Sequence, residues 1–487
     1  MHSSRSDSRA GRLDALLGRA DAQLGATVER LVSAHHRRRL TARGRLSALE
    51  PPDDGLWTTA EPPPRDGNSI EVMIDGEDAL ARMQDALQRA KSSVLVAGWH
   101  VTPAFRLRRR GPMLRELLSE LAQRVEVRVL LWAGAPLPLF RPSRSDVRAA
   151  CESLRRGSRI AVGLDSRERP LHCHHEKAIV VDDRTAFVGG IDLTYLGGDR
   201  LDSSEHPARG TLGWHDAASV IEGPLVVDVG AHLRLRWHEV TGEALERPDG
   251  PAPQGRTAAQ LVRTVPERIY DAVPDGEFGI LEAYVRALRS AERFIYLESQ
   301  FLWSPELVAI LAAKLRRPPS DEFRVVLLLP ANANNGEDNT RGQLAFLVEA
   351  DAGAGRLLAC TLYQVGGRDQ VYVHAKIGIV DDRWLTIGSA NLNEHSLFND
   401  TELNVITCDG DLARGTRIRL WREHLQHKDV EGEPHEVIDR LWKPIAEEQL
   451  ARRLRGETPT HRLARLPHVS RRSRRLLGPL DSLLVDG

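Results

Sequence analysis

Two histidines, each followed by a lysine and an aspartate at the same spacing, carry the most specific chemistry in this sequence. An H-x-K-x4-D motif begins at His175 and returns 199 residues later at His374. A neutral imidazole can attack phosphorus without the repulsion that an anionic nucleophile meets at a phosphodiester, and a protonated imidazole can give the leaving alkoxide its proton. Histidine suits both tasks because its unperturbed pKa is about 6.5. The pair therefore predicts a phosphodiesterase that works through a covalent phosphohistidine.

A lysine lies two residues after each histidine, at Lys177 and Lys376. Its ammonium would neutralise the phosphoryl oxygens as charge shifts in the transition state. Only six of the 67 basic residues are lysines, so a lysine in both motifs indicates a need for a compact ammonium rather than a planar guanidinium. Asp182 and Asp381 complete the predicted catalytic set. They stand where hairpin turns begin, which favours a structural role over a chemical one.

A second group of polar residues repeats around the motifs and predicts support for the phosphate. Asp192 and Asn391 each lie 17 residues after their histidine. The Asn391 amide can donate a hydrogen bond to a phosphoryl oxygen, whereas an ionised Asp192 cannot and is expected to hold a lysine or backbone groups. Ser389, close to Asn391, joins this supporting set.

Each histidine also needs a carboxylate that fixes its tautomer. Glu402 lies 28 residues after His374 and is the candidate in the second half of the chain. Asp216, in a Trp-His-Asp sequence, is the candidate in the first half. We therefore expect Glu402 to bind His374 and Asp216 to bind His175.

The alternative interpretation is that the motif residues are ordinary strand residues. One H-x-K-x4-D would be weak evidence, because a histidine and a lysine two apart on a strand are common. Two copies, followed at one offset by Gly189-Gly190 and Gly388-Ser389, are far harder to obtain by chance. The His-Cys-His run at 172–174 raises the question of a metal cluster. Adjacent strand residues point to alternate sides and cannot all converge, so we expect no metal and no cofactor.

The elements that must position these residues repeat as well. Apolar residues share one helix face in each half, at Leu80, Met83, Leu87 and Ala90 and at Leu281, Tyr284, Val285, Leu288 and Ala291. Runs rich in apolar residues indicate strands buried on both faces, at 94–97, 125–132, 294–297 and 323–329. Each motif leads into a hairpin, formed by 178–181 with 185–188 and by 377–380 with 384–387.

This order predicts an α/β protein with two duplicated α/β domains, each a mixed, mainly parallel β-sheet flanked by helices. We place the domains at 68–246 and 258–445, with a linker rich in proline and glycine at 247–257. Residues 1–67 are expected to form a helical extension and a proline-rich linker, and 446–487 a basic tail. The amphipathic pattern from Leu13 to Val32 is expected to pack on the body, with a membrane-surface role as the alternative.

Composition limits the partners and the compartment. A net charge of −1 does not indicate a global electrostatic grip on nucleic acid. The four cysteines form no C-x-x-C pair and predict a reducing compartment. The first residues lack the apolar segment of a secretory signal, and no run of 18 apolar residues predicts a membrane span. We expect a cytoplasmic protein that meets any lipid substrate peripherally, at a membrane surface.

The sequence around both motifs resembles the phospholipase D superfamily, and in particular its bacterial members with two motifs. The similarity covers about residues 68–430, including the regions at 174–193, 214–216, 294–300 and 372–393. It implies two similar domains related by a pseudo-twofold axis, with the motifs meeting at their interface. It also implies a metal-independent mechanism in which His175 is the nucleophile and His374 the general acid.

The resemblance makes hydrolysis of a phospholipid to phosphatidic acid and free head group the leading hypothesis, with water or an alcohol as acceptor and a monomer as the active form. A cardiolipin synthase-like phosphatidyltransferase is the nearest alternative. A nuclease is less favoured because the chain has both motifs and no excess of basic residues. A lipid-binding scaffold that is not an enzyme would be favoured by degenerate motifs, and both motifs here are complete.

Overall fold

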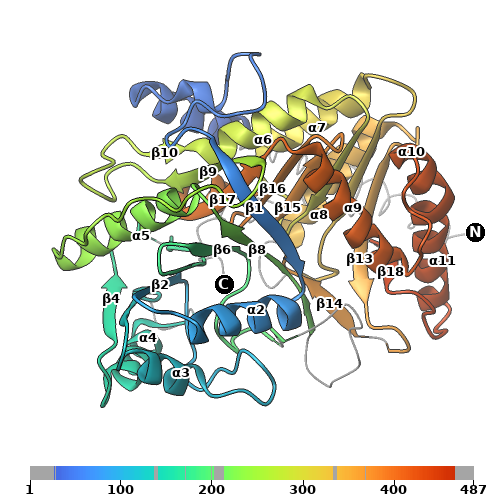
Figure 1. Ribbon diagram of the computed structural model, residues 1–487. Coiled ribbons are helices and arrows are strands. Elements are labelled where there is room, and N and C mark those ends of the chain that lie inside the picture. Colours follow the sequence, from blue (N-terminus) through green and yellow to red (C-terminus); the bar gives the residue numbers. More distant parts are fainter. Residues whose placement is uncertain are drawn as a thin grey trace, which may run out of the picture.

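The computed structural model describes residues 27, 29–136, 141–170, 172–198, 200–201, 213–332, 337–367 and 369–466. Two mixed β-sheets, one from each half of the chain, form its centre (Figure 1). Within the first sheet, neighbouring strands follow the order β1 (Arg65–Ile74), β8 (Ala217–Glu222), β6 (Thr185–Gly189), β5 (Ala178–Val181), β2 (Ser93–Gly98), β3 (Glu126–Trp132) and β4 (Ala161–Asp165). Strands β2, β3 and β4 pair in parallel, and the other pairs are antiparallel.

The second sheet repeats this order. Its strands are β9 (Thr257–Val265), β17 (Glu402–Thr407), β16 (Trp384–Gly388), β15 (Ile377–Val380), β11 (Phe294–Glu298), β12 (Arg324–Leu328) and β13 (Leu357–Tyr363). Strand β10 (Glu277–Phe278) extends one edge, and β14 (Gln370–Val373) and β18 (Leu463–Arg465) pair with β13. The matching order confirms the predicted fold class, a duplicated α/β unit with mixed β-sheets flanked by helices. The sheets were expected to be mainly parallel, but in the orders given above only β2–β3–β4 and β11–β12–β13 pair in parallel, because both strands of each motif hairpin and their neighbours run antiparallel.

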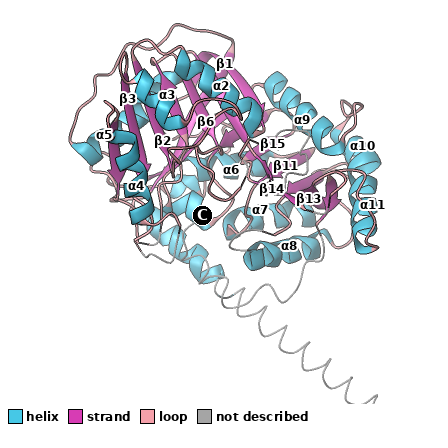
Figure 2. Cartoon of the chain, turned by 90° about the horizontal axis from the view of Figure 1, so that it is seen from below, coloured by secondary structure: helices cyan, strands magenta, loops and turns pink. Residues whose placement is uncertain are grey.

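Helices cover the outer face of each sheet (Figure 2). On the first sheet these are α2 (Gly76–Gln88), α3 (Leu114–Leu121) and α4 (Arg144–Arg155), which share an apolar core with β2 and β3. On the second they are α6 (Gly279–Ser290), α7 (Pro305–Arg316) and α8 (Glu337–Asp351). A third core joins the inner faces of both sheets with α5 (Val226–Thr241) and α9 (Gly410–Leu425). One continuous core therefore spans both halves and fixes their relative position.

The periodicity in the sequence locates these elements closely. The helix face that contains Leu80 and Leu87 is α2, and its counterpart in the second half is α6. Both hairpins form as predicted, β5 with β6 and β15 with β16. Two consecutive aspartates with positive φ make each turn, at 182–183 and 381–382. Aspartate tolerates this left-handed backbone, which reverses the chain within the three residues that separate the paired strands.

The C-terminal end of the chain differs from the prediction where it is described. Residues 446–466 are not a tail: α11 (Lys443–Leu454) and β18 pack on the second domain, and Leu463 is fully buried. Residues 467–487 lie outside the described residues. So does most of the amphipathic pattern that begins at Leu13, although 29–42 is helical and its His36 stacks on Phe398 with ring centroids 3.8 Å apart. The remaining short elements are a 3-10 turn (Leu46–Ala48), α10 (Pro434–Val437) and two π-helical turns (His395–Asn399 and Ile438–Trp442).

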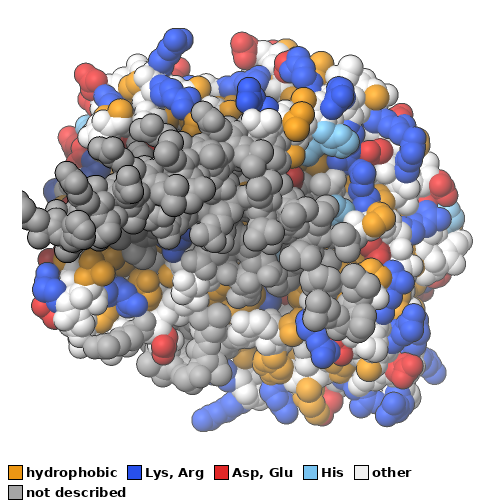
Figure 3. All heavy atoms as spheres, turned by 180° about the vertical axis from the view of Figure 1, so that it is seen from behind, with side chains coloured by type: hydrophobic (Ala, Val, Ile, Leu, Met, Phe, Trp, Pro, Cys, Tyr) orange, Lys and Arg blue, Asp and Glu red, His pale blue; other side chains and the backbone are white. Residues whose placement is uncertain are grey.

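The surface seen in Figure 3 shows lysine and arginine side chains interspersed with aspartate and glutamate, in keeping with the net charge of −1. Within the described ranges, no helix combines the length and the apolar character that crossing a bilayer requires.

Candidate active site

The segments that carry the two motifs meet where the halves of the chain exchange strands. Strand β14, which leads into His374, pairs in parallel with β7 (Gly213–His215) from the first half. The segment before His175 makes the equivalent contact with the second half, through a bridge between His174 and Thr401. The backbone N–H of each motif histidine donates to the opposite half: His374 to the His215 carbonyl at 2.8 Å and His175 to the Thr401 carbonyl at 2.9 Å. Each histidine is therefore positioned by the other domain.

The carboxylates that bind the histidines are crossed between the halves. His175 Nδ1 lies 3.0 Å from Glu402 Oε1, and His374 Nδ1 lies 2.7 Å from Asp216 Oδ2. Both carboxylates were predicted, but their assignment was wrong: each was expected to bind the histidine of its own half. The cause is the strand exchange, because the residues after β7 and after Thr401 run beside the histidine of the opposite motif.

This arrangement leaves one nitrogen of each imidazole for chemistry. A carboxylate on Nδ1 holds the proton there and makes Nε2 the basic atom. Both side chains are almost completely buried, at 6% exposure for His175 and 5% for His374. Burial lowers the pKa of His374 well below its ordinary value, and nearby positive charges lower it further, from Lys376, Arg200, Lys177 and His175. The influence of His175 and Lys177 on His374 places both motifs in one electrostatic group.

The two lysines lie in this group with different surroundings. Lys177 Nζ is 3.6 Å from Asp192 Oδ2 and donates to the His175 carbonyl at 2.5 Å. Lys376 Nζ donates to the carbonyl of His374. Burial lowers the pKa of Lys376 to about 7, and the charge of Lys177 lowers it further against the opposing charge of Asp216. A negatively charged group bound between the lysines would restore the ammonium.

Asn391 and Ser389 have separate tasks. Asn391 is fully buried, and among the described residues neither its amide nitrogen nor its amide oxygen has a hydrogen-bond partner. An unsatisfied buried amide is costly, so it is suited to a ligand. Ser389 instead donates to Glu402 Oε2 at 2.5 Å, and Ser396 donates to Oε1 at 2.6 Å. Ser389 and Ser396 therefore both hold Glu402, the carboxylate that binds His175. Ser396 was not indicated by the sequence.

Arg200 is a further residue of the site that the sequence did not indicate. Its guanidinium carbon lies 3.4 Å from the centre of the Trp214 ring, and its Nη1 lies 3.9 Å from Asp216 Oδ2. The side chain is 4% exposed, yet its Nε and Nη1 have no hydrogen-bond partner within the described part of the chain. These two unsatisfied donors lie beside the His374–Asp216 pair. The guanidinium is therefore suited to bind an anion. Arg200 itself belongs to no motif. Its partners in the structure, Trp214 and Asp216, come from the Trp-His-Asp sequence that was singled out.

The motif aspartates lie at the other end of their strands and are not part of the reacting group, which corrects their place in the predicted catalytic set. Asp182 accepts hydrogen bonds from three successive backbone N–H groups, those of Lys91, Ser92 and Ser93. Asp381 does the same for Glu292, Arg293 and Phe294. Each carboxylate fastens its hairpin turn to the start of the neighbouring strand, β2 or β11. Their role is structural, as their position in the turns suggested.

Glycine is required at one position next to the site. A Cβ atom on Gly190 would lie 2.2 Å from Asp216 Oδ1, a distance that overlaps the two atoms. Glycine at position 190 therefore leaves room for the Asp216 carboxylate, which binds His374. At the equivalent place in the second half, Ser389 fills the space and donates to Glu402.

Comparisons with known proteins show which families the chain resembles. The family model described as "Cardiolipin synthase, PLD-like domain" matches residues 284–421. The chain is 26% identical to Phospholipase D A of Dictyostelium discoideum, over 77% of this chain and 37% of that protein. It is 25% identical to the major cardiolipin synthase ClsA of Bacillus subtilis, over 78% of this chain and 75% of that protein. The crystal structure of phosphatidylserine synthase from Haemophilus influenzae matches 78% of this chain at a TM-score of 0.51 and 12% identity, and shares the fold.

The fold and the duplicated histidine motifs define a duplicated α/β protein with one composite site. The chain is similar to members of the phospholipase D superfamily, both to phospholipases D and to a cardiolipin synthase. It spans 36% to 50% of the length of the phospholipases D from Dictyostelium discoideum, Schizosaccharomyces pombe and Bos taurus that it matches.

Proposed function

We propose that this protein is a phospholipase D-type phosphodiesterase, which hydrolyses a phospholipid at a membrane surface to phosphatidic acid and a free head group. The observation that supports this most is the crossed pair of histidine–carboxylate contacts, His175 with Glu402 and His374 with Asp216, in one buried group with two lysines. One chain supplies both motifs, so the proposed active form is a monomer.

In the proposed mechanism His175 Nε2 attacks phosphorus, and the bond from phosphorus to the head-group oxygen breaks. His374 gives its proton to that oxygen, and a phosphohistidine remains on His175. His374 then takes a proton from water, the hydroxide attacks phosphorus, and the phosphorus–nitrogen bond breaks. His175 is assigned as the nucleophile on the family resemblance.

The cations of the site support both proposed steps. Without substrate, burial and then the positive charges around His374 lower its pKa and so favour the neutral imidazole. A bound phosphodiester brings a negative charge between Lys177, Lys376 and Arg200, which offsets these cations and favours uptake of the proton that His374 must deliver. The same three cations, with the free Asn391 amide, would stabilise the phosphoryl oxygens in the transition state.

A second candidate is a phosphatidyltransferase of the cardiolipin synthase kind. It is favoured by the description of the matching family model and by the match to ClsA, which covers three quarters of that protein. The chemistry differs only in the acceptor: an alcohol of a second lipid, rather than water, would attack the phosphohistidine.

Product analysis separates these candidates. Purified protein is offered vesicles of phosphatidylcholine, vesicles of phosphatidylglycerol, and single-stranded DNA, with His175→Ala and His374→Ala as controls. Choline with phosphatidic acid supports the phospholipase D, and cardiolipin with glycerol supports the transferase. DNA fragments would instead indicate a nuclease. No turnover of any ester by the wild-type protein would contradict an enzymatic function.

A further inference from the structure

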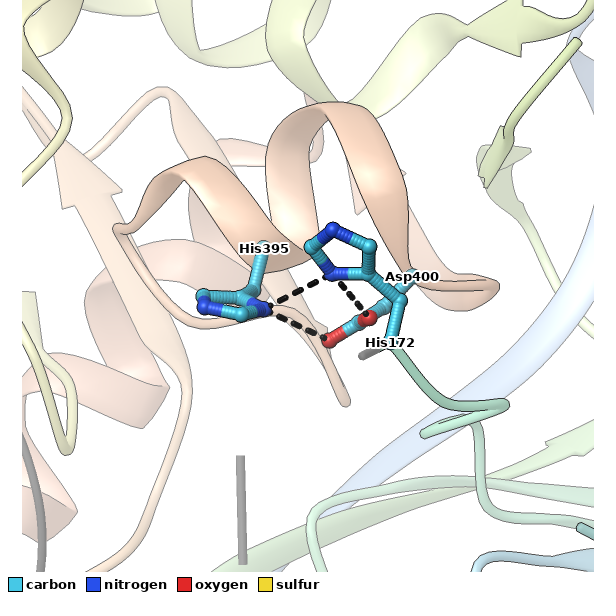
Figure 4. A group of neighbouring side chains, drawn as sticks. All are labelled: His172, His395 and Asp400. Atoms are coloured by element: carbon cyan, nitrogen blue, oxygen red, sulfur yellow. Dashed lines mark hydrogen bonds and ion pairs between the residues drawn. The ribbon is translucent and has the colours of Figure 1, made fainter. Parts of the chain in front are cut away.

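A cluster of metal-ligating side chains lies beside the site but takes no part in the proposed reaction (Figure 4). His172 Nδ1 is 3.0 Å from His395 Nδ1 and 3.3 Å from Asp400 Oδ1, and His395 Nδ1 is 3.9 Å from Asp400 Oδ2. The His395 and Asp400 side chains are fully buried, and His172 is 12% exposed. One ligand atom of each residue therefore lies within 4.8 Å of the others, and the cluster is reached from the surface on the side of His172.

Two segments far apart in the sequence build this cluster. His172 belongs to the segment that leads into the first motif, whereas His395 begins the π-helical turn His395–Asn399 and Asp400 follows that turn. The Cys173 backbone N–H donates to Asp400 Oδ1 at 2.9 Å and fixes the carboxylate. The sequence suggested His172, Cys173 and His174 as a possible cluster and gave a reason against it. Only His172 of those three joins this cluster, and its partners come from the other half.

Hydrogen bonding alone satisfies this cluster poorly. One proton can lie between the two Nδ1 atoms, but Asp400 Oδ2 is buried without a hydrogen-bond partner among the described residues. Its distance of 3.9 Å from His395 Nδ1 is too long for a hydrogen bond. Ligands about 2.0–2.1 Å from a tetrahedral zinc ion are separated by about 3.3 Å. The separation of 3.0 Å between the two Nδ1 atoms and that of 3.3 Å between His172 Nδ1 and Asp400 Oδ1 lie around that value, and the second carboxylate oxygen, Oδ2, lies 3.9 Å from His395 Nδ1.

Two other clusters of this kind share His215, and they are already satisfied. His215 Nδ1 contacts Asp75 Oδ1 and Nε2 contacts Glu298 Oε2, both at 2.8 Å, so each ring nitrogen has a carboxylate partner. The charges of these carboxylates outweigh burial and raise the pKa of His215 well above its ordinary value, so it is a cation rather than a metal ligand. The contrast singles out the cluster at His172.

We propose that His172, His395 and Asp400 bind a divalent transition-metal ion, for which Zn²⁺ is the best match. Two imidazoles and one carboxylate are a common ligand set for this ion, and a fourth position would open toward the exposed side of His172. The ion would join the two halves of the chain next to the site. His172 is three residues before His175, Asp400 is two before Glu402, and His395 precedes Ser396, which donates to Glu402. Its role is to position the His175–Glu402 pair, not to take part in the reaction.

The test measures binding rather than catalysis, so its outcome is independent of the proposed function. Untagged full-length protein is stripped with a chelator and titrated with Co²⁺, whose visible absorption reports tetrahedral nitrogen and oxygen ligands, and then with Zn²⁺. We expect one Co²⁺ bound per chain, displacement by Zn²⁺, and a Zn²⁺-dependent rise in Tm. Affinity should fall more than about 100-fold in His172→Ala and Asp400→Asn.

The matched control is His435→Ala, which removes a histidine of α10 that is 23% exposed and lies outside the cluster. It should keep wild-type affinity. His172→Gln keeps the bulk of the most accessible ligand, so the test remains valid where a buried variant does not fold. The proposal is overturned if the wild-type protein binds neither ion. It is also overturned if His172→Gln binds both ions as tightly as the wild type does. In either case the cluster is a hydrogen-bonded network only.

Discussion

The two halves of the molecule repeat one fold but surround their histidines differently. Glu402, which binds His175, accepts hydrogen bonds from two serine hydroxyls. Asp216, which binds His374, accepts from the backbone of Ala217 and lies beside the guanidinium of Arg200. The carboxylate of one pair thus accepts from neutral hydroxyls, whereas the carboxylate of the other lies beside a cation. Duplication preserved the geometry, while side-chain changes gave the two imidazoles different electrostatics.

The lysines show the same contrast. Lys177 has a carboxylate partner in Asp192, whereas the equivalent residue beside Lys376 is the uncharged Asn391. At this repeated position the first half therefore carries a carboxylate that the second half lacks. We propose that this charge asymmetry leaves more positive charge on the side of the second motif for the phosphodiester of the proposed reaction, which favours a division of labour between nucleophile and acid.

Replacing each histidine should give the largest effects and separate the two roles. His175→Ala should abolish turnover of every substrate and leave no phosphoprotein, because the nucleophile is lost. His374→Ala should lower kcat by about 10²–10⁴-fold with a choline ester but much less with a p-nitrophenyl ester, whose leaving group needs no proton. Steady-state rates and rapid-quench labelling with ³²P-substrate measure both. If the p-nitrophenyl ester instead rescues His175→Ala, the assigned roles are reversed.

Replacing each carboxylate should break the crossed pairing next. Glu402→Gln should slow phosphoprotein formation, and Asp216→Asn should reproduce the leaving-group dependence of His374→Ala, each by about 10²–10⁴-fold, because the imidazole loses its fixed tautomer. The double variant Asp216→Asn/His374→Ala should be little slower than His374→Ala alone. Additive losses in that pair, with coupling between Asp216 and His175 instead, would contradict the crossed contacts.

Exchanging the residues beside the lysines should have a smaller effect. Asn391→Asp places a carboxylate beside Lys376, as Asp192 lies beside Lys177, and should raise KM for an anionic phosphodiester by about 10-fold or more. Asp192→Asn should change KM in the opposite direction or leave it unchanged. The dependence of kcat/KM on ionic strength is the second measurement, since the excess charge governs it. Equal effects from the two substitutions would remove the proposed charge asymmetry.

The turn aspartates should give the smallest effects, on stability rather than on rate. Asp182→Asn should lower the free energy of unfolding by about 1 kcal/mol because this carboxylate is partly exposed, and Asp381→Asn by about 1–3 kcal/mol because it is buried. Specific activity of the folded protein should not change. Urea unfolding followed by circular dichroism measures both variants, and a loss of kcat without a loss of stability would return these residues to the catalytic set.

The Asp182 contribution should also depend on pH. Burial opposes ionisation, but the backbone N–H groups of Ser92, Ser93 and Lys91 outweigh it and lower the pKa of Asp182 below its usual value. A carboxyl with a lowered folded-state pKa adds stability that is complete above its unfolded pKa of about 3.9 and is lost as the pH falls through the folded-state pKa. The difference in Tm between wild-type protein and Asp182→Asn should therefore be constant near neutral pH and shrink below about pH 4.

Sequence periodicity predicted the elements well because both faces of the central strands and one face of each helix are apolar. The hairpins after each motif and the helix faces of α2 and α6 follow directly from that pattern. Strand β18 has only three residues, too few for a pattern, so it was predicted as part of a tail. The partners of the motif histidines depend on the pairing of β7 with β14, which local sequence does not encode. Arg200 was missed because a single arginine in an arginine-rich chain carries no motif.

The exchange of strands between the halves has a consequence for how the gene copies can change over time. Each half holds a histidine whose carboxylate partner comes from the other half. A substitution that displaces Glu402 or Asp216 therefore removes a contact from the motif of the opposite repeat. Neither repeat can change at these two positions without affecting the other.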